Sequence, residues 1–471
     1  MRKLALRAVA CGAALAAVAV SIGVSFGDAT PVKIPPPGPG TAATATDRCN
    51  ITPPTTAITP ALLSSGLPCA GTITAPFTLD NIQHGFDFYS WLTFLALNAP
   101  ATGGVIGSGP GPGGDAPTRW ESWKSMESVM LPGGAKPTPW GTPPVIPPVC
   151  RGLAGPGTEI VSMVGKTPNV LSATNQPFKT GPLIDQNGQY VRYDIMMNET
   201  MFDYIVAHTL YNKPGQNAFT APVDFPEGFA SKPPPGSPPN IAPGFHGAIM
   251  IKLAWKTLGK NDNPLHFHTM TALVYQPPVA NPKIKESCHK AVLGLVGFHI
   301  AHKTKSDPQW LWSSFEQVDN VPTDADVAAH ALRAHYNFYD PGCKSCKINE
   351  PPPRPWDPNT VPFPNNYHSQ ITRVISITPE VTTMNAAFQA LLKGKVWENY
   401  MLISTQWPTD ATSKTDPTGK PAPTFLANTT AETYVQGHTP QSSSNCIECH
   451  NNATMTNGKF SDFTYILENA H

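Results

Sequence analysis

The sequence predicts an α+β fold, with a β-rich central region and helices towards both ends. Short apolar or alternating runs, separated by Pro, Gly, Asn and Asp, fill the middle of the chain, as is typical of strands. Longer apolar stretches near the two ends have helical length and stop at Pro or Gly. The chain has 471 residues, of which 40% are hydrophobic and only 14% are charged. This composition supports a substantial buried core.

The chain begins with a pattern typical of an export signal. Three basic residues within the first seven precede an apolar stretch that runs to about Phe26, and the small residues Gly27 and Ala29 follow. We interpret residues 1–29 as a secretory signal peptide. An uncleaved membrane anchor is the alternative, because the apolar stretch is close to spanning length. The predicted location is the bacterial periplasm, an oxidising compartment.

The remaining chain divides into an arm and one large domain. Residues 30–75 are rich in Pro, Thr and Ala, and we expect them to form an extended arm. We expect residues 76–471, which include a Cys-x-x-Cys-His motif at residues 446–450, to form a single interwoven domain. The 54 prolines and 37 glycines together lie below the content at which disorder is expected. We therefore expect a folded domain with long Pro- and Gly-rich connections.

The elements of this domain follow in order along the sequence. Leu79–Pro100 predicts the first helix, and residues 118–131 have tryptophans and a methionine at near-helical spacing. Residues 324–339 predict a helix carrying His330 and His335. Residues 384–408 predict a helix that ends near Gly394, followed by a strand. Four central runs predict strands, at residues 246–258, 265–277, 291–304 and 310–320.

A Cys-x-x-Cys-His motif at residues 446–450 carries the clearest chemical signal. Two thiols at this spacing attach to haem vinyl groups, and the histidine that follows binds the iron. Chance would give about 0.005 such motifs in a chain of this composition. A redox dithiol would need a βαβ context, and a zinc site a second ligand pair. We predict one haem c, with Cys446 and Cys449 as attachment sites and His450 as the proximal ligand.

The late position of this motif restricts where the rest of the haem pocket comes from. Only 21 residues follow His450, too few to build a separate small cytochrome domain. Met455 lies five residues beyond His450 and is expected not to reach the opposite side of the ring, whereas the terminal His471 would have to fold back. The pocket and any sixth ligand are therefore expected from the upstream chain.

Four upstream histidines are candidates for a distal ligand. His266 and His268 are two residues apart, so on a strand they would share a face. His299 and His302 would point to opposite faces on a strand but share a face on a helix. The alternatives are ordinary hydrogen-bonded histidines or a separate metal site. His299 and His302 are also the candidates for a catalytic acid or base.

The other cysteines predict disulfides. Cys343, Cys346 and Lys347 form a Cys-x-x-Cys-Lys sequence, which is known as an unusual attachment site with lysine as the iron ligand. That site normally accompanies several Cys-x-x-Cys-His haems, and only one is present here. We therefore favour a disulfide, either between these two cysteines or with Cys150 or Cys288, over a second haem. Cys49 and Cys69 are a plausible local pair.

Five sequence blocks lie between residue 198 and the C-terminus, at residues 198–216, 247–258, 292–322, 403–408 and 426–436. Through these blocks the chain resembles a poorly characterised family of exported bacterial cytochrome c proteins. The longest block of resemblance contains His299, His302, Trp310, Trp312 and Glu316, and we expect a function common to the family to lie there. The resemblance implies a periplasmic haem c protein that transfers electrons, without a known substrate. The second Cys-x-x-Cys is not part of it.

Three functions remain open on the sequence alone. The first is a periplasmic c-type cytochrome that exchanges electrons with a redox partner protein or a small-molecule donor or acceptor. The second is a haem-dependent oxidoreductase or peroxidase with an open sixth site, and the third is a binding protein with haem as a structural staple. Whether the protein is an enzyme stays open. Equal numbers of basic and acidic residues, 32 each, argue against nucleic acid and, apart from the signal segment, against a membrane as partner.

Overall fold

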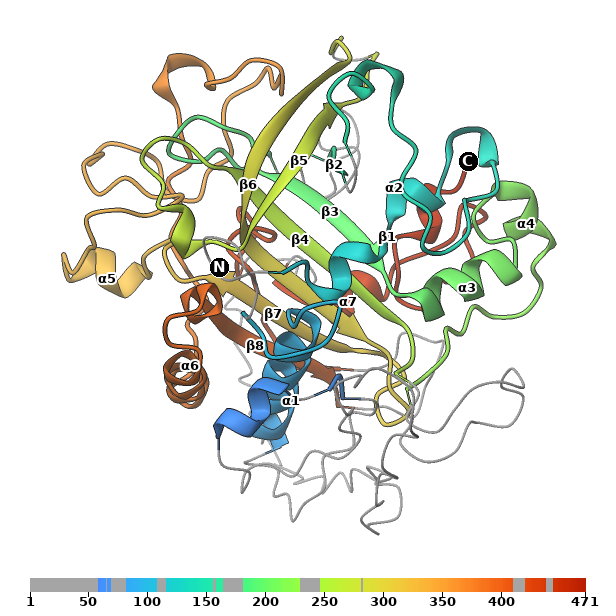
Figure 1. Cartoon of the computed structure of the whole chain (residues 1–471). Helices are drawn as coiled ribbons and strands as arrows, with labels where there is room; N and C mark the ends of the chain where they lie inside the picture. Colours follow the sequence, from blue (N-terminus) through green and yellow to red (C-terminus); the bar gives the residue numbers. More distant parts are fainter. Residues whose placement is uncertain are drawn as a thin grey trace, which may run out of the picture.

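The computed structural model describes residues 58–64, 66–68, 82–107, 116–155, 158–163, 181–228, 246–280, 283–409, 420–437 and 444–471. Within these residues one large sheet is flanked by helices (Figure 1), which confirms the α+β class. The strands are β1 (Lys124–Ser125), β2 (Glu159–Val161), β3 (Arg192–Met197), β4 (Ile249–Thr257), β5 (Thr269–Gln276), β6 (Ser287–His302), β7 (Leu311–Gln317), β8 (Tyr400–Pro408) and β9 (Pro421–Ala422).

The described helices are mostly short, and long irregular connections join the elements. The α-helices are α1 (Ile82–Leu97), α2 (Met126–Val129), α3 (Glu199–Ala207), α4 (Lys213–Ala218), α5 (Asp324–Ala328), α6 (Pro379–Leu391) and α7 (Cys446–His450). Turns of 3₁₀ helix are η1 (Pro60–Ser64), η2 (Arg119–Ser122), η3 (Pro132–Gly134), η4 (Pro148–Cys150), η5 (Pro264–His266), η6 (Pro364–Asn366), η7 (Val396–Asn399) and η9 (Leu467–Asn469). No helix in the described part of the chain is both long enough and apolar enough to cross a membrane.

The sheet is built around β6, its longest strand. The order of the sheet is β1-β3-β4-β6-β7-β8-β9, with antiparallel pairing throughout. β5 pairs with the first half of β6, and β2 adds to β5 in parallel. An isolated bridge between Met163 and Tyr193 then joins the end of β2 to β3. The pairings β3, β4, β6, β5 and β2 therefore close into a ring at one end of the sheet.

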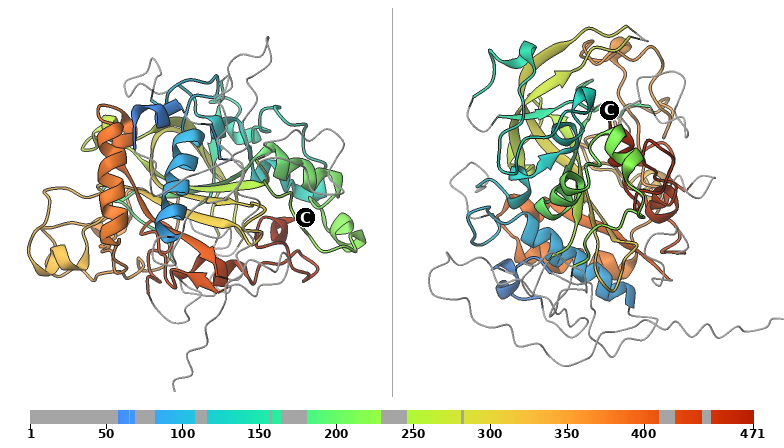
Figure 2. Two further views of the ribbon diagram at one scale, coloured as in Figure 1. Left: turned by 90° about the horizontal axis from the view of Figure 1, so that it is seen from below. Right: turned by 90° about the vertical axis from the view of Figure 1, so that its right-hand side faces the viewer.

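Alternation along the strands gives the sheet two different buried faces. On β4, Ile249 and Ile251 belong to one apolar cluster and Met250 to another, and on β7 Leu311 and Trp312 divide in the same way. Helices α1 and α6 pack on β8 at the first face and lie side by side (Figure 2). Residues of α3, α7 and the C-terminal chain pack at the second face. The strand period of two thus separates the helical layer from the Cys-x-x-Cys-His segment.

The strand predictions for the central runs are confirmed by β4, β5, β6 and β7. The predicted helices near residues 79–100 and 384–394 are confirmed by α1 and α6, and β8 follows α6 as expected. Two helical expectations are wrong. Residues 118–131 divide into η2, β1 and α2, because Lys124 and Ser125 pair with β3. The helix expected to carry His330 and His335 ends at Ala328, and His330 has a φ of 54°.

Two disulfides connect the described cysteines outside α7. Cys150 bonds to Cys288 and ties η4 to the start of β6, and Cys343 bonds to Cys346. The signal peptide and the Cys49–Cys69 pair lie outside the described residues. The described part of the predicted arm includes Leu62 and Leu67, which are buried in the same cluster as α1.

Burial of Asp87 on α1 predicts a specific pH dependence of stability. Its Oδ1 accepts hydrogen bonds from the Thr405 backbone N–H at 2.8 Å and from Gln83 at 3.1 Å, yet burial raises the pKa of Asp87 to about 7. Between pH 4 and 7 the unfolded chain ionises this group while the folded chain retains the proton, so stability falls as pH rises. We expect Asp87→Asn to keep both acceptor contacts, to flatten this fall, and to be more stable than wild type at pH 8 by about 2–4 kcal/mol.

Urea unfolding at pH 4 to 8 measures this difference. The matched control is Glu350→Gln, which changes an exposed carboxylate paired with exposed Lys347 at 3.0 Å, and it should follow wild type at every pH. A constant difference between Asp87→Asn and wild type across this range would contradict the assignment.

Candidate haem attachment site

The Cys-x-x-Cys-His segment forms a single helical turn, α7, at the second face of the sheet. Asn445 caps this turn, since its side chain accepts from the Glu448 N–H. Ile447 is fully buried, and its N–H donates to Gln406 on β8 at 3.0 Å. Cys446 and Cys449, three residues apart, lie on a common side of the turn. Both are half-exposed and neither belongs to a disulfide. The buried Ile447 therefore fixes the turn while the two thiols are accessible.

His450 is held in one orientation by contacts from the chain that follows. Its Nδ1 lies 2.6 Å from the backbone carbonyl oxygen of Phe463. Because a carbonyl only accepts hydrogen bonds, Nδ1 must carry a proton, and in the neutral imidazole Nε2 then carries the lone pair. The rings of Trp312 on β7 and Tyr465 lie with their centroids 4.4 and 5.2 Å from the His450 ring. The imidazole therefore has the tautomer that a metal bound through Nε2 requires.

The chain after His450 folds back onto both α7 and α4. Met455 is buried in the second apolar cluster, and its backbone pairs with Lys459. The carbonyl of His471 accepts from the Lys213 N–H at the start of α4, so the C-terminus lies beside α4 (Figure 1). The Tyr465 hydroxyl donates to the Cys449 carbonyl at 2.8 Å. The chain after His450 therefore stabilises α7 through hydrogen bonds between side chains and backbone carbonyls.

His299 and His302 are on a strand, so they point to opposite faces. His302 faces α1, where it accepts a hydrogen bond from the Tyr89 hydroxyl and donates one to the His246 carbonyl. Burial lowers the pKa of His302 to about 3. His299 points to the face that carries α7, and its Nε2 is 3.6 Å from the Glu432 carboxylate. Of this pair, only His299 shares a face with the candidate site.

His266 and His268 do not form the shared-face pair that a continuous strand would give. A 3₁₀ turn ends at His266, and β5 begins only at Thr269. His266 is exposed and contacts Asp319 at 3.3 Å. His268 is buried, stacks on Trp397 and contacts Glu121 at 3.2 Å. The turn therefore sends the two side chains to different environments.

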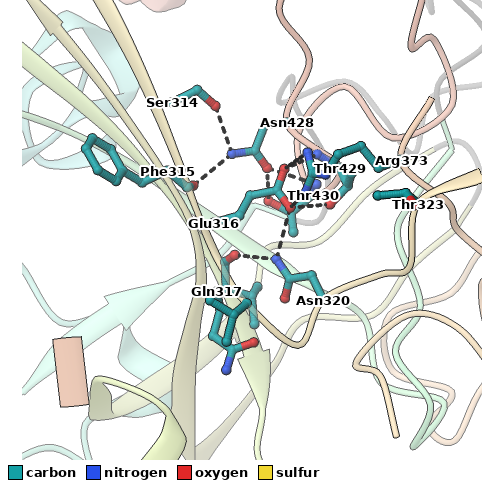
Figure 3. A network of polar contacts seen from close by, with 12 residues as sticks. Ser314, Phe315, Glu316, Gln317, Asn320, Thr323, Arg373, Asn428, Thr429 and Thr430 are labelled. Carbon is teal, nitrogen blue, oxygen red and sulfur yellow. Dashed lines mark hydrogen bonds and ion pairs between the residues drawn. The ribbon is translucent and has the colours of Figure 1, made fainter. Parts of the chain in front are cut away.

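A buried ion pair ties the segment before α7 to the sheet. Glu316 on β7 accepts from two guanidinium nitrogens of Arg373 at 3.2 and 2.7 Å, and from the N–H and hydroxyl of Thr429 at 2.6 and 2.5 Å (Figure 3). Asn428 donates to the Ser314 hydroxyl and the Phe315 carbonyl. The predicted functional residue Glu316 is thus a structural anchor for the strand-to-tail connection.

The structure also places the second Cys-x-x-Cys. Cys343 and Cys346 are bonded to each other, in agreement with the disulfide interpretation. Lys347, exposed to solvent, pairs with Glu350 at 3.0 Å. In the described chain His450 alone therefore follows a Cys-x-x-Cys whose thiols are not oxidised.

Comparison with protein-family models, curated proteins and solved structures gave no match. Function therefore has to be inferred from the residues of the site. Sequence reasoning did not find Phe463, Arg373 or Thr429. Thr429 lies in one of the blocks that resemble the family, and this was a weak indication of its importance. The Phe463 carbonyl belongs to the backbone, so no residue type in the sequence indicates its role.

The residues of α7 fit a covalently attached haem. The two cysteines are half-exposed and lie on one side of a helical turn, and the Nδ1–H of the adjacent histidine donates to the Phe463 carbonyl. No group of three or more His, Cys, Asp or Glu side chains in the described residues forms an alternative metal cluster. The donor set of α7 is thus one histidine and two thiols at the spacing that haem c attachment requires.

Proposed function

We propose that this protein is an exported c-type cytochrome with one covalent haem, attached through Cys446 and Cys449 and ligated by His450. The observation that carries the proposal is the 2.6 Å hydrogen bond from His450 Nδ1 to the Phe463 carbonyl, because it presets the iron-binding tautomer. When bound, haem supplies one-electron chemistry. The two disulfides support a periplasmic location. The partner would be a redox protein or a small-molecule donor or acceptor.

The surroundings of His450 support electron transfer. The buried Trp312 and the half-buried Tyr465 cover the imidazole on two sides and restrict water at the ligand. Burial, together with proximity to Cys449, keeps the pKa of Tyr465 above its usual value, so this phenol stays neutral. A neutral, largely apolar surround favours a stable ligand and a defined reduction potential.

The pyridine haemochrome assay on the purified full-length protein tests this function. We expect one haem per chain that resists extraction with acidified solvent. The absence of covalent haem would refute the proposal, and two haems per chain would contradict the disulfide between Cys343 and Cys346.

A haem-dependent oxidoreductase is a second candidate, and His299 is the observation that favours it. His299 lies on the face that carries α7, and its contact with Glu432 makes a histidine–carboxylate pair suited to proton transfer. Optical spectra separate the two functions. A high-spin spectrum that shifts with carbon monoxide or cyanide supports the oxidoreductase, whereas a low-spin spectrum without response supports the electron carrier.

A further inference from the structure

The turn that presents the Phe463 carbonyl to His450 has an unfavourable backbone conformation. Asp462 and Phe463 have φ values of 52° and 64°, and neither is glycine. Two consecutive non-glycine residues in the left-handed region are uncommon, because Cβ crowds the following carbonyl. The turn is closed by the Thr464 N–H, which donates to the Ser461 carbonyl at 3.2 Å. Surrounding structure must therefore hold this turn in place.

Lys303 is the strongest contact that holds the turn. Its ammonium group is fully buried and lies 2.6 Å from Asp462 Oδ2. The same carboxylate oxygen accepts from the Phe225 N–H at 2.8 Å. Lys303 follows directly after β6, and its own N–H and carbonyl bond to Ala248 and Gly228. The charge that meets Asp462 is thus fixed to the central sheet.

We expect the ion pair to be charged at neutral pH. Burial by itself would lower the pKa of Lys303, but Asp462 and Asp224 together raise it above its usual value. Burial raises the pKa of Asp462 to about 6, against the opposing effect of Lys303. The buried Lys303 ammonium lies 2.6 Å from a carboxylate oxygen of each aspartate. If the turn moved, the buried charges of Lys303 and Asp462 would no longer be paired, so the ion pair restricts movement of the turn.

We propose that the Lys303–Asp462 ion pair is a positioning device for the proximal histidine: it holds the left-handed Asp462–Phe463 turn so that the Phe463 carbonyl keeps His450 protonated at Nδ1. This inference rests on the proposed function for its effect on haem. It assigns a role to Lys303, which follows directly after β6 and whose described side-chain contacts are with Asp462 and Asp224 rather than with the motif. A stronger hydrogen bond at Nδ1 makes the imidazole a better donor and stabilises the oxidised iron.

Three single variants and one double variant test the device. Lys303→Met removes the positive charge with little change in length. Asp462→Asn removes the negative charge but keeps a residue that tolerates the left-handed region. Asp224→Asn is the matched control, because Asp224 also binds Lys303 at 2.6 Å but is half-exposed and distant in sequence from Phe463. The double variant Lys303→Met/Asp462→Asn leaves no unpaired charge at Asp462 and serves if Lys303→Met alone does not fold.

The first measurement uses the full-length chain without haem, labelled with ¹⁵N-histidine. The His450 ring signals are assigned by their loss in His450→Gln. We expect wild type and Asp224→Asn to show the Nδ1–H tautomer, and Lys303→Met, Asp462→Asn and the double variant to lose it in favour of a mixture. If these three variants keep the Nδ1–H tautomer, the inference is overturned.

The second measurement is the reduction potential of the haem-loaded protein. Acting only as charges, the two single variants would shift the potential in opposite directions, because one loses a positive and the other a negative charge. Acting through His450, both weaken the same hydrogen bond, so both potentials should rise relative to Asp224→Asn. Opposite shifts would overturn the inference while leaving the haem assignment intact. A wild-type chain without covalent haem would instead refute the proposed function, and the tautomer measurement would still decide the inference.

Discussion

Replacing Arg373 by methionine is expected to lower the free energy of unfolding by about 3–5 kcal/mol. Arg373 is 2% exposed, and its partner Glu316 is fully buried. The substitution removes both guanidinium contacts, at 3.2 and 2.7 Å, and leaves an ionised carboxylate compensated mainly by Thr429. An uncompensated buried charge costs far more than the loss of an exposed ion pair.

Denaturant unfolding monitored by tryptophan fluorescence measures this effect. The control is Arg333→Met, which removes an arginine that pairs with Asp319 at 2.6 Å but is 59% exposed. We expect that variant to lose less than about 1 kcal/mol. The double variant Glu316→Gln/Arg373→Met should recover part of the loss, because no charge is left unpaired. Equal losses in the two arginine variants would show that the buried pair does not anchor this part of the fold.

The Glu316–Arg373 ion pair also affects the candidate site, because Glu316 binds Thr429. It belongs to the segment that precedes α7, and its backbone N–H as well as its hydroxyl binds Glu316. The neighbouring Asn428 N–H donates to Glu432, which contacts His299 (Figure 3 shows Asn428 and Thr429 beside Glu316). Loss of Arg373 is therefore expected to destabilise both the sheet and the segment around Thr429 that precedes the attachment motif.

The Cys446→Ala/Cys449→Ala double variant is expected to lose all covalent haem and to remain folded. Both cysteines are half-exposed, whereas the buried Ile447 holds α7 in place. Without thiols no thioether can form, although His450 keeps its hydrogen bond to Phe463. Small changes at half-exposed positions should alter the stability of the haem-free chain by about 0.5 kcal/mol or less.

Haem staining of denatured protein after electrophoresis detects the covalent link. Cys343→Ala/Cys346→Ala is the matched control, since it removes the other Cys-x-x-Cys and should leave one haem per chain. Circular dichroism of the haem-free proteins checks that the fold is unchanged. Covalent haem that persists in the Cys446→Ala/Cys449→Ala variant would place the attachment elsewhere, and its loss in the control variant would implicate Cys343 and Cys346.

Local pattern was a good guide wherever a segment had to match one buried face. β4 and β7 alternate between two apolar clusters, and their runs were recognisable because strand residues repeat every two positions. α6 begins with a capping threonine and ends where Leu392 and Gly394 break the pattern. These features depend on neighbours in sequence, so they could be read without knowledge of distant contacts.

The same patterns failed where tertiary contacts decided the backbone. Residues 324–339 are rich in helix-forming residues, but α5 has no buried residues and stops after five. Short isolated helices are marginal without an apolar face to pack. At Lys124 and Ser125 the opposite happened, since pairing with Met197 and Met196 on β3 interrupted a helical spacing. Packing, or its absence, overrode propensity in both segments.

The sequence by itself determined the α+β class, the central strands and the residues of the candidate site, because Cys446, Cys449 and His450 lie within five positions of one another. Only the tertiary structure decided which histidine shares a face with α7, and which backbone carbonyl fixes the tautomer of His450. Those choices depend on contacts between segments distant in sequence, such as Lys303 and Asp462, 159 residues apart. The left-handed turn at Phe463 contains no glycine, so no local sequence pattern predicts its backbone conformation.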